Sequence, residues 1–292
     1  MGKRQTKSHP GEILCNRPAK VIIRRALKED LRDRGDITTR ATVPSAQTGK
    51  AVIIAKERGV IAGQAVAAAV FDELEKGVKY TPLVKDGDFV EPGTEIASLK
   101  GKMWVIIAGE RTALNILGRC CGIASLTRLY VDEVSGTVCK ITETRKTAPG
   151  LRYLDKASVL SGGGVNHRIG LYDAFLIKEN HIAAIGGIRE AILACKDFAA
   201  KHGNFPVMVE AEDFAEFKLA QSAAPDRILL DNMTPDQIRE CVAARVDGIL
   251  LEATGGITID NVRQYAETGV DLISIGALTH SVKALDLSLL VR

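Results

Sequence analysis

The stretch A-F-L-I-K-E-N-H (Ala174–His181) is a short apolar run that ends directly at a charged side chain. Similar apolar runs recur between residues 138 and 275, and segments with the spacing of amphipathic helices separate them. This alternation is typical of parallel strands joined by helices, and at least six such strands favour a barrel over an open sheet. The predicted strands are Val138–Thr142, Ala174–Lys178, Val207–Glu210, Arg227–Leu230, Gly248–Leu251 and Asp271–Ile275.

Two of the intervening helices have recognisable beginnings. Asp213 followed by Glu216, and Thr234 followed by Pro235 and Gln237, match the capping box. In this motif the first side chain accepts a backbone N–H of the first helical turn, and the third residue after it returns a second hydrogen bond. Helices therefore start after these two residues.

Polar residues and glycines follow the predicted strands. In a parallel barrel the catalytic groups lie at the carboxyl ends of the strands. Glycine-rich loops there, such as A-T-G-G-I and I-G-A-L-T-H, expose backbone N–H groups that can hold a phosphate at the start of a helix, although each glycine pair alone could be a plain turn. The strand-end residues are Thr144–Lys146, Lys178, Glu210, Asp231, Glu252, Thr254–Gly256 and Gly276–Ala277.

Basic side chains are crowded into two segments, T-E-T-R-K-T-A-P-G (Thr142–Gly150) and S-G-G-G-V-N-H-R-I-G-L-Y-D-A-F-L-I-K-E-N-H (Ser161–His181). Taken singly, each cation reads as a surface charge, the histidine as a core or loop residue, and the glycine triplet as a turn. Taken together, few carboxylates separate these cations, and they predict a pocket for a polyanion. The basic residues are Arg145, Lys146, His167, Arg168 and Lys178.

The predicted pocket combines this basic wall with two acids, Glu210 and Asp231, and a phosphate-binding nest between Thr254 and Gly276. Carboxylate and phosphate oxygens are the ligands of hard cations, so the combination favours a magnesium-bound sugar phosphate and transfer or cleavage at that sugar. One alternative is a Schiff base formed by Lys178 or Lys146. Another is a non-enzymatic barrel that senses a sugar phosphate.

The first half of the chain has a different pattern. Antiparallel strands with tight turns are predicted at its centre, and that segment resembles half of a lipoyl or biotinyl carrier domain without the second half. Gly122 is predicted to divide the long helical region in two. The predicted elements are a helix over Ala19–Asp30, a loop over Gly35–Thr38, one or two strands within Lys50–Ala62, a helix over Gln64–Lys76, strands over Val78–Val84 and Phe89–Lys100, and helical structure over Met103–Val134.

Composition excludes several classes of protein. The chain has 292 residues, a net charge of +3, 26% charged residues and only 4% aromatic residues, which argues against nucleic-acid binding. Six cysteines without a C-x-x-C pair indicate a reducing, cytoplasmic setting. No secretory signal or apolar run of about 18 residues is present. Met1, Gly2 and Thr6 fit the permissive myristoylation pattern, but a soluble tail is favoured.

Several long motifs resemble those of the quinolinate phosphoribosyltransferases, a type II phosphoribosyltransferase family whose activity is also called carboxylating nicotinate-nucleotide pyrophosphorylase. The resemblance covers nearly the whole chain from about Ala26. It rests on G-D-I-T-T from Gly35, E-R-T-A-L-N-I-L from Glu110, T-R-K-T-A-P-G-L-R from Thr144, G-G-G-V-N-H-R-I-G-L-Y-D-A-F-L-I-K-E-N-H from Gly162, L-L-D-N-M from Leu229 and G-A-L-T-H-S-V-K-A-L-D from Gly276.

The resemblance implies an α/β architecture with an N-terminal open α/β sandwich and an incomplete, six- or seven-stranded α/β barrel. The expected division is a flexible tail over residues 1–17, the sandwich over 18–117 and 277–292, and the barrel over 118–276. It also implies the reaction of quinolinate with phosphoribosyl pyrophosphate to nicotinate mononucleotide, pyrophosphate and carbon dioxide, with magnesium, in de novo NAD biosynthesis.

Residue roles follow from the same resemblance. Arg145, His167 and Arg168 match binders of the quinolinate carboxylates. Arg111 matches an arginine delivered into the neighbouring subunit's pocket, which implies a homodimer or a hexamer built from dimers. Lys146, Lys178, Glu210 and Asp231 match the catalytic residues, and the two acids also match the groups that hold ribose hydroxyls and magnesium, directly or through water. Thr254, Gly255, Gly276, Ala277 and His280 match the surroundings of the 5-phosphate.

Two departures and two relatives qualify the resemblance. The family usually has E-V-E where this chain has Met208-Val209-Glu210, and Met208 is interpreted as a packing change in preference to an altered outer shell of the metal. Thr254 stands where serine is commoner and keeps the hydroxyl. A branch linked to molybdenum metabolism shares the fold, and nicotinate phosphoribosyltransferase handles a monoacid. The intact N-H-R and I-K-E-N-H motifs favour quinolinate over the substrate of that branch, and the pair His167 and Arg168 beside Arg145 favours a diacid over nicotinate.

Overall fold

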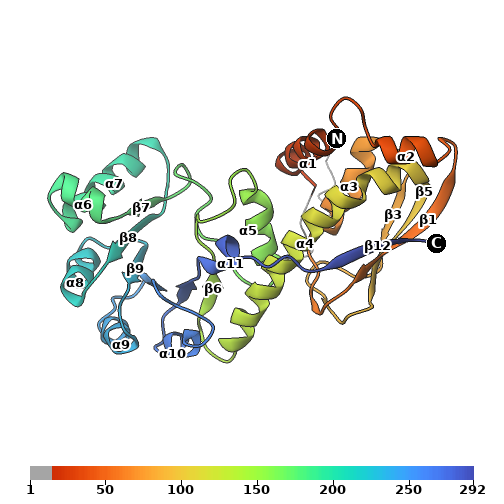
Figure 1. Ribbon diagram of the computed structural model, residues 1–292. Coiled ribbons are helices and arrows are strands. Elements are labelled where there is room, and N and C mark those ends of the chain that lie inside the picture. The colour runs from red at the N-terminus through yellow and green to blue at the C-terminus, as the bar shows by residue number, and fades with distance from the viewer. Residues whose placement is uncertain (1–14) are drawn as a thin grey trace, which may run out of the picture. The chain divides into compact units, whose positions relative to one another are not determined.

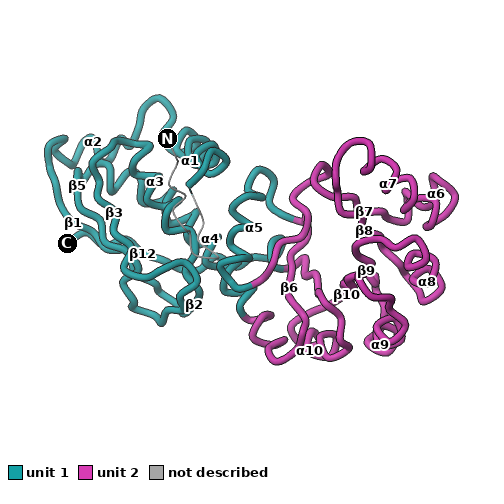
Figure 2. The backbone as a smooth tube through the Cα atoms, turned by 180° about the vertical axis from the view of Figure 1, so that it is seen from behind, with its two compact units in different colours: residues 1–128, 147–163, 278–292 teal, residues 129–146, 164–277 magenta. Residues whose placement is uncertain are grey.

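The computed structural model describes residues 15–292, which form two compact units. Unit 1 contains the described residues up to Arg128 together with Thr147–Gly163 and Leu278–Arg292, and unit 2 contains Leu129–Lys146 and Gly164–Ala277 (Figure 2). Most of the expected tail, including the Met1, Gly2 and Thr6 pattern, lies outside the described residues.

Unit 1 is built on an antiparallel sheet with the strand order β12-β1-β5-β3. Ala51 lies opposite Leu99 on one side and opposite Val291 on the other, so the last residues of the chain pair with an early strand. A separate pair, β2 and β4, is also antiparallel, as expected for this region. The strands are β1 (Thr48–Ala55), β2 (Gly59–Val60), β3 (Lys79–Pro82), β4 (Phe89–Val90), β5 (Glu95–Lys102) and β12 (Leu287–Val291).

Helices supply the rest of the core of unit 1. Ile23, Phe71 and Leu117 come from three different helices and are fully buried in one cluster with Ile53 of β1. In the first helix the buried face is formed by Ala19, Ile23 and Leu27, apolar residues at helical spacing. The helices are α1 (Arg17–Leu31), α2 (Ile37–Thr42), α3 (Gln64–Leu74), α4 (Met103–Glu133), α5 (Arg152–Ser161) and, at the boundary with unit 2, α11 (Ala277–His280).

Two local predictions in this half are wrong. Gly122 does not divide the helix, because α4 runs unbroken from Met103 to Glu133. A Cβ atom at Gly122 would lie 2.2 Å from the backbone oxygen of Lys283, so the glycine allows the C-terminal segment to approach the helix. The predicted loop over Gly35–Thr38 is also shorter than expected, because the Asp36 side chain accepts the Thr39 N–H and starts α2.

Unit 2 is built on a parallel sheet of six strands in the order β6-β11-β10-β9-β8-β7. Within residues 15–292, β6 and β7 form the two edges and do not pair with each other, so the barrel is incomplete, as the fold class predicted. An isolated parallel bridge joins Thr142 to Val165 beside β6. The strands are β6 (Lys140–Thr142), β7 (Phe175–Ile177), β8 (Val207–Ala211), β9 (Arg227–Asp231), β10 (Leu250–Thr254) and β11 (Leu272–Ser274).

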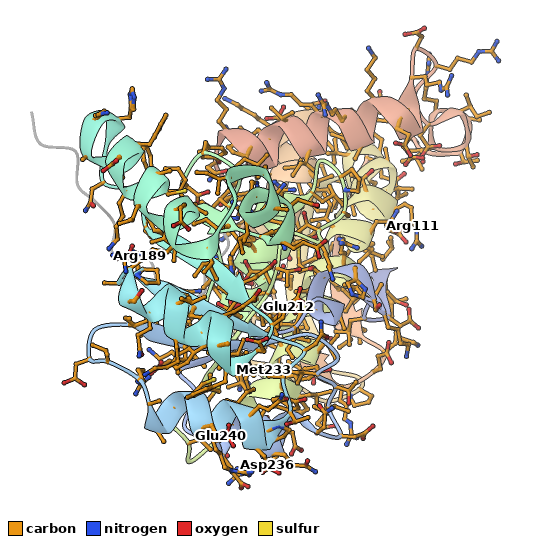
Figure 3. The ribbon with its side chains drawn as sticks, turned by 90° about the vertical axis from the view of Figure 1, so that its left-hand side faces the viewer. Arg111, Arg189, Glu212, Met233, Asp236 and Glu240 are labelled. Atoms are coloured by element: carbon orange, nitrogen blue, oxygen red, sulfur yellow. The ribbon has the colours of Figure 1, made fainter. Side chains whose placement is uncertain are left out.

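Five helices follow the strands β7 to β10 and cover the outside of the sheet (Figure 1). Asp236 and Glu240 project from α9 into solvent (Figure 3). The capping box of Thr234 and Gln237 is present, and Asp213 accepts the Glu216 N–H as predicted. The helices are α6 (Glu179–Ile185), α7 (Ile188–His202), α8 (Phe214–Ser222), α9 (Pro235–Ala243) and α10 (Val262–Ala266).

The strand boundaries differ most at β10. The sequence predicted Gly248–Leu251, whereas the strand covers Leu250–Thr254. Gly248 has a φ of 89°, a left-handed conformation that belongs to a turn and not to a strand. The shift matters for the site because it places Glu252 inside the strand and Thr254 at its carboxyl end.

The boundaries of the two compact units differ from the domain boundaries expected from the sequence. Residues 118–128 and 147–163 were assigned to the barrel domain by the sequence, and they belong to unit 1 by their contacts. One partly buried ion pair explains part of this grouping: Arg119 of α4 donates to both carboxylate oxygens of Asp155 in α5, each at 2.8 Å. None of the described helices has the length and apolar character needed to cross a membrane.

Candidate active site

A cavity of about 630 Å³ lies in unit 2 where the parallel strands end. Residues from β7 to β11, from the loop that follows β6 and from the loop that precedes β7 contribute to it, and most lie at the carboxyl ends of strands, as expected for a barrel. Its lining is Thr144, Arg145, Lys146, His167, Arg168, Leu176, Lys178, Glu210, Leu229, Asp231, Asn232, Glu252, Thr254, Gly255, Gly256 and Ser274.

The two arginines of the basic wall have hydrogen-bond donors that the protein leaves unused. The Nε atoms of Arg145 and Arg168 are buried and have no hydrogen-bond partner. Burial lowers the pKa of Arg168, and repulsion from Arg145 lowers it further. Buried donors without an acceptor are costly in a folded protein. A bound anion between the two guanidinium groups would supply acceptors and reduce their repulsion.

The loop after His167 holds Arg168 in place. Asp173 accepts the backbone N–H groups of Ile169 and Gly170 at 2.7 and 2.8 Å, which closes a compact turn. Within this turn, Nη1 of Arg168 donates to the carbonyl of Ala174 at 3.1 Å. The guanidinium group is therefore oriented before any ligand binds, which lowers the entropic cost of binding.

The acid and the lysine at the ends of β7 and β8 form an ion pair. Ile177 and Val209 are paired in the sheet, so the next residues, Lys178 and Glu210, leave adjacent strands side by side. Nζ of Lys178 donates to Oε1 of Glu210. A Schiff-base lysine requires surroundings that are poor in acids. The position of Glu210 thus argues against that alternative for Lys178.

The ends of β9 and β10 form a concave backbone surface. Asp231 is paired with Thr254, and the N–H of Asn232 donates to the Thr254 carbonyl at 2.9 Å. Gly255 and Gly256 have φ values of 89° and 61°, and a Cβ at Gly255 would lie 2.2 Å from Oδ1 of Asn232. Consecutive residues in such conformations form anion-binding concavities. Glycine is required here by both conformation and space.

A fully buried carboxylate lies at the floor of the cavity. Oε2 of Glu252 accepts a hydrogen bond from Nη1 of Arg227 at 2.7 Å, whereas Oε1 has no hydrogen-bond partner and lies 3.5 Å from Nε2 of His167. Burial raises the pKa of Glu252, and Arg227 opposes that rise. The buried Ser274 hydroxyl in the same floor is outside hydrogen-bond geometry, but its interaction with Glu252 also opposes the rise in pKa. The cavity therefore contains unused acceptors as well as unused donors.

Comparison with known proteins gives the family. The model of the quinolinate phosphoribosyl transferase N-terminal domain matches residues 36–121, and that of the C-terminal domain matches residues 123–290. The chain belongs to the quinolinate phosphoribosyltransferase family. A relative in Mycobacterium leprae, a nicotinate-nucleotide pyrophosphorylase [carboxylating], is 42% identical over 276 residues, which cover 93% of this chain and 96% of the relative.

Other members of the quinolinate phosphoribosyltransferase family agree with this assignment. A probable nicotinate-nucleotide pyrophosphorylase [carboxylating] of Bacillus subtilis is 42% identical, and the match covers 87% of both chains. The structure of the nicotinate-nucleotide pyrophosphorylase from Francisella tularensis superimposes with a TM-score of 0.91 at 36% identity and covers 98% of this chain and 100% of that one. The predicted fold and family are therefore confirmed.

Most of the residues predicted for the site line one cavity, including the whole basic wall, both acids and the start of the phosphate nest. Gly276 and Ala277 belong to the same unit but do not line it. Arg111 and His280 belong to unit 1, where Arg111 points outward from α4 with 65% of its side chain exposed (Figure 3) and Nδ1 of His280 contacts the Ser281 hydroxyl. The roles of all the predicted site residues, in the cavity lining or outside it, stay predictions.

Sequence reasoning missed Arg227, Asn232 and Ser274. Arg227 begins an apolar run and looks like the solvent-exposed start of a strand, and only the register of β9 and β10 reveals its partner Glu252. Met208 is 4% exposed and does not line the cavity. Its burial is consistent with its interpretation as a packing residue. Among residues 15–292 no group of three or more histidine, cysteine, aspartate or glutamate side chains is arranged to hold a metal ion.

Proposed function

We propose that this chain transfers the phosphoribosyl group of phosphoribosyl pyrophosphate to quinolinate with loss of a carboxylate as carbon dioxide, giving nicotinate mononucleotide and pyrophosphate for NAD biosynthesis. The observation that carries the proposal is the pair of buried Nε donors without protein acceptors on Arg145 and Arg168, two residues that line one cavity. The relatives named above carry this activity in their names.

Quinolinate fits the basic wall because it carries two adjacent carboxylates. A charge-assisted hydrogen bond contributes roughly 1.5 to 3 kcal/mol net, so three or four of them could supply the roughly 8 kcal/mol of a micromolar affinity. The planar forks of Arg145 and Arg168 suit carboxylates better than ammonium groups do. A monoacid such as nicotinate would leave one of the buried guanidinium groups without an acceptor.

Phosphoribosyl pyrophosphate fits the opposite side of the cavity. The turn at Gly255 offers backbone N–H groups to the 5-phosphate, and Glu210 and Asp231 offer acceptors to the ribose hydroxyls. Lys146 and Lys178 place positive charge where the pyrophosphate would lie. The arrangement brings the pyridine nitrogen and the ribose carbon that carries pyrophosphate into one chamber.

Magnesium is the cofactor that we propose. It usually binds through one or two carboxylates together with substrate phosphates, and Glu210 and Asp231 provide two carboxylates in the same cavity, directly or through water. When bound, the ion would neutralise charge on the pyrophosphate. The two lysines of the basic wall provide the remaining positive charge from the chain itself.

The residues then support two bond changes in sequence. The ring nitrogen forms a bond to the ribose carbon as the carbon–oxygen bond to pyrophosphate breaks, and Lys146 and Lys178 stabilise the charge on the departing oxygens. The ring nitrogen becomes cationic. The bond between the ring and the adjacent carboxylate breaks, its electron pair stays on the ring next to the cationic nitrogen, carbon dioxide leaves and a proton from solvent completes the product. No lysine imine is required.

One assay tests the proposal and its cofactor. Purified protein with quinolinate, phosphoribosyl pyrophosphate and magnesium is expected to release carbon dioxide and pyrophosphate in equal amounts. Nicotinate in place of quinolinate should react at least about a hundredfold less efficiently, because one buried cation would lack its partner. Removal of the metal with a chelator should abolish turnover, and added magnesium should restore it. Efficient turnover of nicotinate would contradict the proposed specificity for quinolinate. Turnover after chelation would contradict the proposed requirement for magnesium.

We also propose a cytoplasmic homodimer, alone or as a unit of a hexamer, in which Arg111 completes the neighbouring site. The outward direction of Arg111 supports this arrangement. Arg111→Ala and Arg168→Ala should each be inactive alone. Coexpressed, they should recover about a quarter of wild-type activity, because half of the dimers are mixed and one of two sites in each is intact. Two differently tagged Arg168→Ala chains are the control. Absence of recovery in isolated mixed dimers would exclude a shared site.

A further inference from the structure

Each of the two imidazole nitrogen atoms of His167 has a polar neighbour. The backbone N–H of Arg168 donates to Nδ1 at 2.8 Å, and Nε2 lies 3.5 Å from Oε1 of Glu252. Because Nδ1 accepts a hydrogen bond in this arrangement, the ring proton belongs on Nε2 and points toward Glu252. The ring orientation is thus coupled to a neighbouring carboxylate and to the backbone of a substrate-binding arginine.

Glu252 lies between two hydrogen-bond donors. Its Oε2 is taken by Nη1 of Arg227 at 2.7 Å, and its Oε1 is buried without any hydrogen-bond partner. A carboxylate has one acceptor for each of the two donors, Arg227 and the Nε2–H of His167. An amide at this position would have only one acceptor oxygen, and its NH₂ group would face one of the donors.

The backbone of His167 has its own support. The N–H of His167 donates to the buried Oε1 of Glu143 at 3.0 Å. A change at Glu252 would therefore leave this backbone contact in place and act on the imidazole ring. When the ring rotates, Nδ1 is lost as an acceptor for the N–H of Arg168, a residue that lines the cavity and has a buried Nε donor without a partner.

We propose that Glu252 is a positioning residue, which accepts the Nε2–H of His167 through Oε1 while Arg227 occupies Oε2, and thereby holds His167 and Arg168 in the orientation that binds an organic carboxylate. The 3.5 Å separation shortens to a hydrogen bond when the ligand is bound, since such contacts often tighten in the complex. The proposal rests on the proposed function for the identity of that carboxylate as quinolinate.

The first test needs no variant of Glu252. In wild-type protein labelled with ¹⁵N in the histidine rings, nitrogen chemical shifts report which ring atom carries the proton. The signals of His167 are assigned by their loss in His167→Asn. The proposal expects a proton on Nε2 and none on Nδ1, with and without quinolinate. A proton on Nδ1, alone or in addition, would overturn it whether or not the chain turns over quinolinate.

The second test separates positioning from a simple loss of structure. Glu252→Gln is expected to raise KM for quinolinate about tenfold, the equivalent of one lost hydrogen bond, and to change KM for phosphoribosyl pyrophosphate less than about twofold. Adding Arg227→Gln removes the competing donor and the unpaired charge. The amide oxygen then turns to His167, and KM for quinolinate should return to within about threefold of wild type.

The outcomes distinguish this inference from the proposed function. Glu240→Gln, an exposed change on α9, is the matched control and should alter neither KM (Figure 3). An unchanged KM in Glu252→Gln, or an equal defect in the single and double variants, would overturn the positioning role. If wild-type protein fails to turn over quinolinate, the proposed function fails, and the ring protonation of His167 still decides the role of Glu252. If Glu252→Gln does not fold, the ring protonation of His167 in the wild-type protein still tests the role of Glu252.

Discussion

Arg168→Ala is expected to lower kcat/KM for quinolinate by about a thousandfold, because it removes charge-assisted hydrogen bonds of roughly 1.5 to 3 kcal/mol each and leaves a ligand carboxylate unpaired. Arg168 already has its buried Nε free for an acceptor, and the only hydrogen bond of its side chain among those identified in residues 15–292 is to the Ala174 carbonyl. Calorimetry should show that quinolinate no longer binds. The fold should remain, because no ion pair involving Arg168 is found in the same residues.

The control for this prediction is Arg189→Ala. Arg189 lies in the first turn of the outer helix α7 (Figure 3), contacts only the hydroxyl of Ser222 at 3.5 Å among its identified partners, and does not line the cavity. The variant Arg189→Ala should leave both turnover and quinolinate binding unchanged. Arg145→Ala should resemble Arg168→Ala because its Nε is equally buried and unpaired. Normal turnover in either cavity variant would refute the assignment of the basic wall to quinolinate.

Lys178→Met is expected to lower kcat by about a hundredfold to a thousandfold, the effect of removing one group that stabilises transition-state charge. The loss has two causes. The ammonium group next to the departing pyrophosphate disappears, and Glu210, which now pairs with Lys178, is left as an uncompensated negative charge in the same cavity. Single-turnover measurements of pyrophosphate release should place the defect in the chemical step, with a smaller change in KM for quinolinate.

Two controls accompany this variant. Lys201→Met, an exposed change near the end of α7, should have no effect. Lys178→Arg keeps the charge and should retain part of the activity. If Lys178 instead acted through a Schiff base, Lys178→Arg would be as inactive as Lys178→Met, and borohydride added with substrate would inactivate the wild-type enzyme irreversibly. Either result would restore the imine alternative.

Several features of the site could be predicted because they depend on local pattern. Lys178 and Glu210 follow short apolar runs, and in a parallel sheet the carboxyl ends of neighbouring strands are adjacent, so their proximity follows from the strand assignment. The same reasoning brought Asp231 together with Thr254, which are paired at the ends of β9 and β10. The two glycines after Thr254 indicated by their residue type a loop that exposes backbone N–H groups.

Other features depend on contacts between distant segments and could not be predicted in the same way. The predicted break at Gly122 ignored the Lys283 backbone, which lies close to it in the fold. The strand β10 was placed two residues too early because the left-handed turn at Gly248 leaves no periodic signal. Arg227 looked like an ordinary strand start, although it is the partner of a fully buried acid.

By itself, the sequence determined the α/β class, the parallel barrel and the kinds of side chain at its strand ends, because hydrophobic periodicity and glycine positions act over a few residues. The long family motifs determined the family. Only the tertiary structure decided that Arg227 and His167 share the carboxylate of Glu252, and that the arginine Nε donors stay unpaired. Those facts depend on strand register and burial, which arise when segments far apart in the chain are packed together.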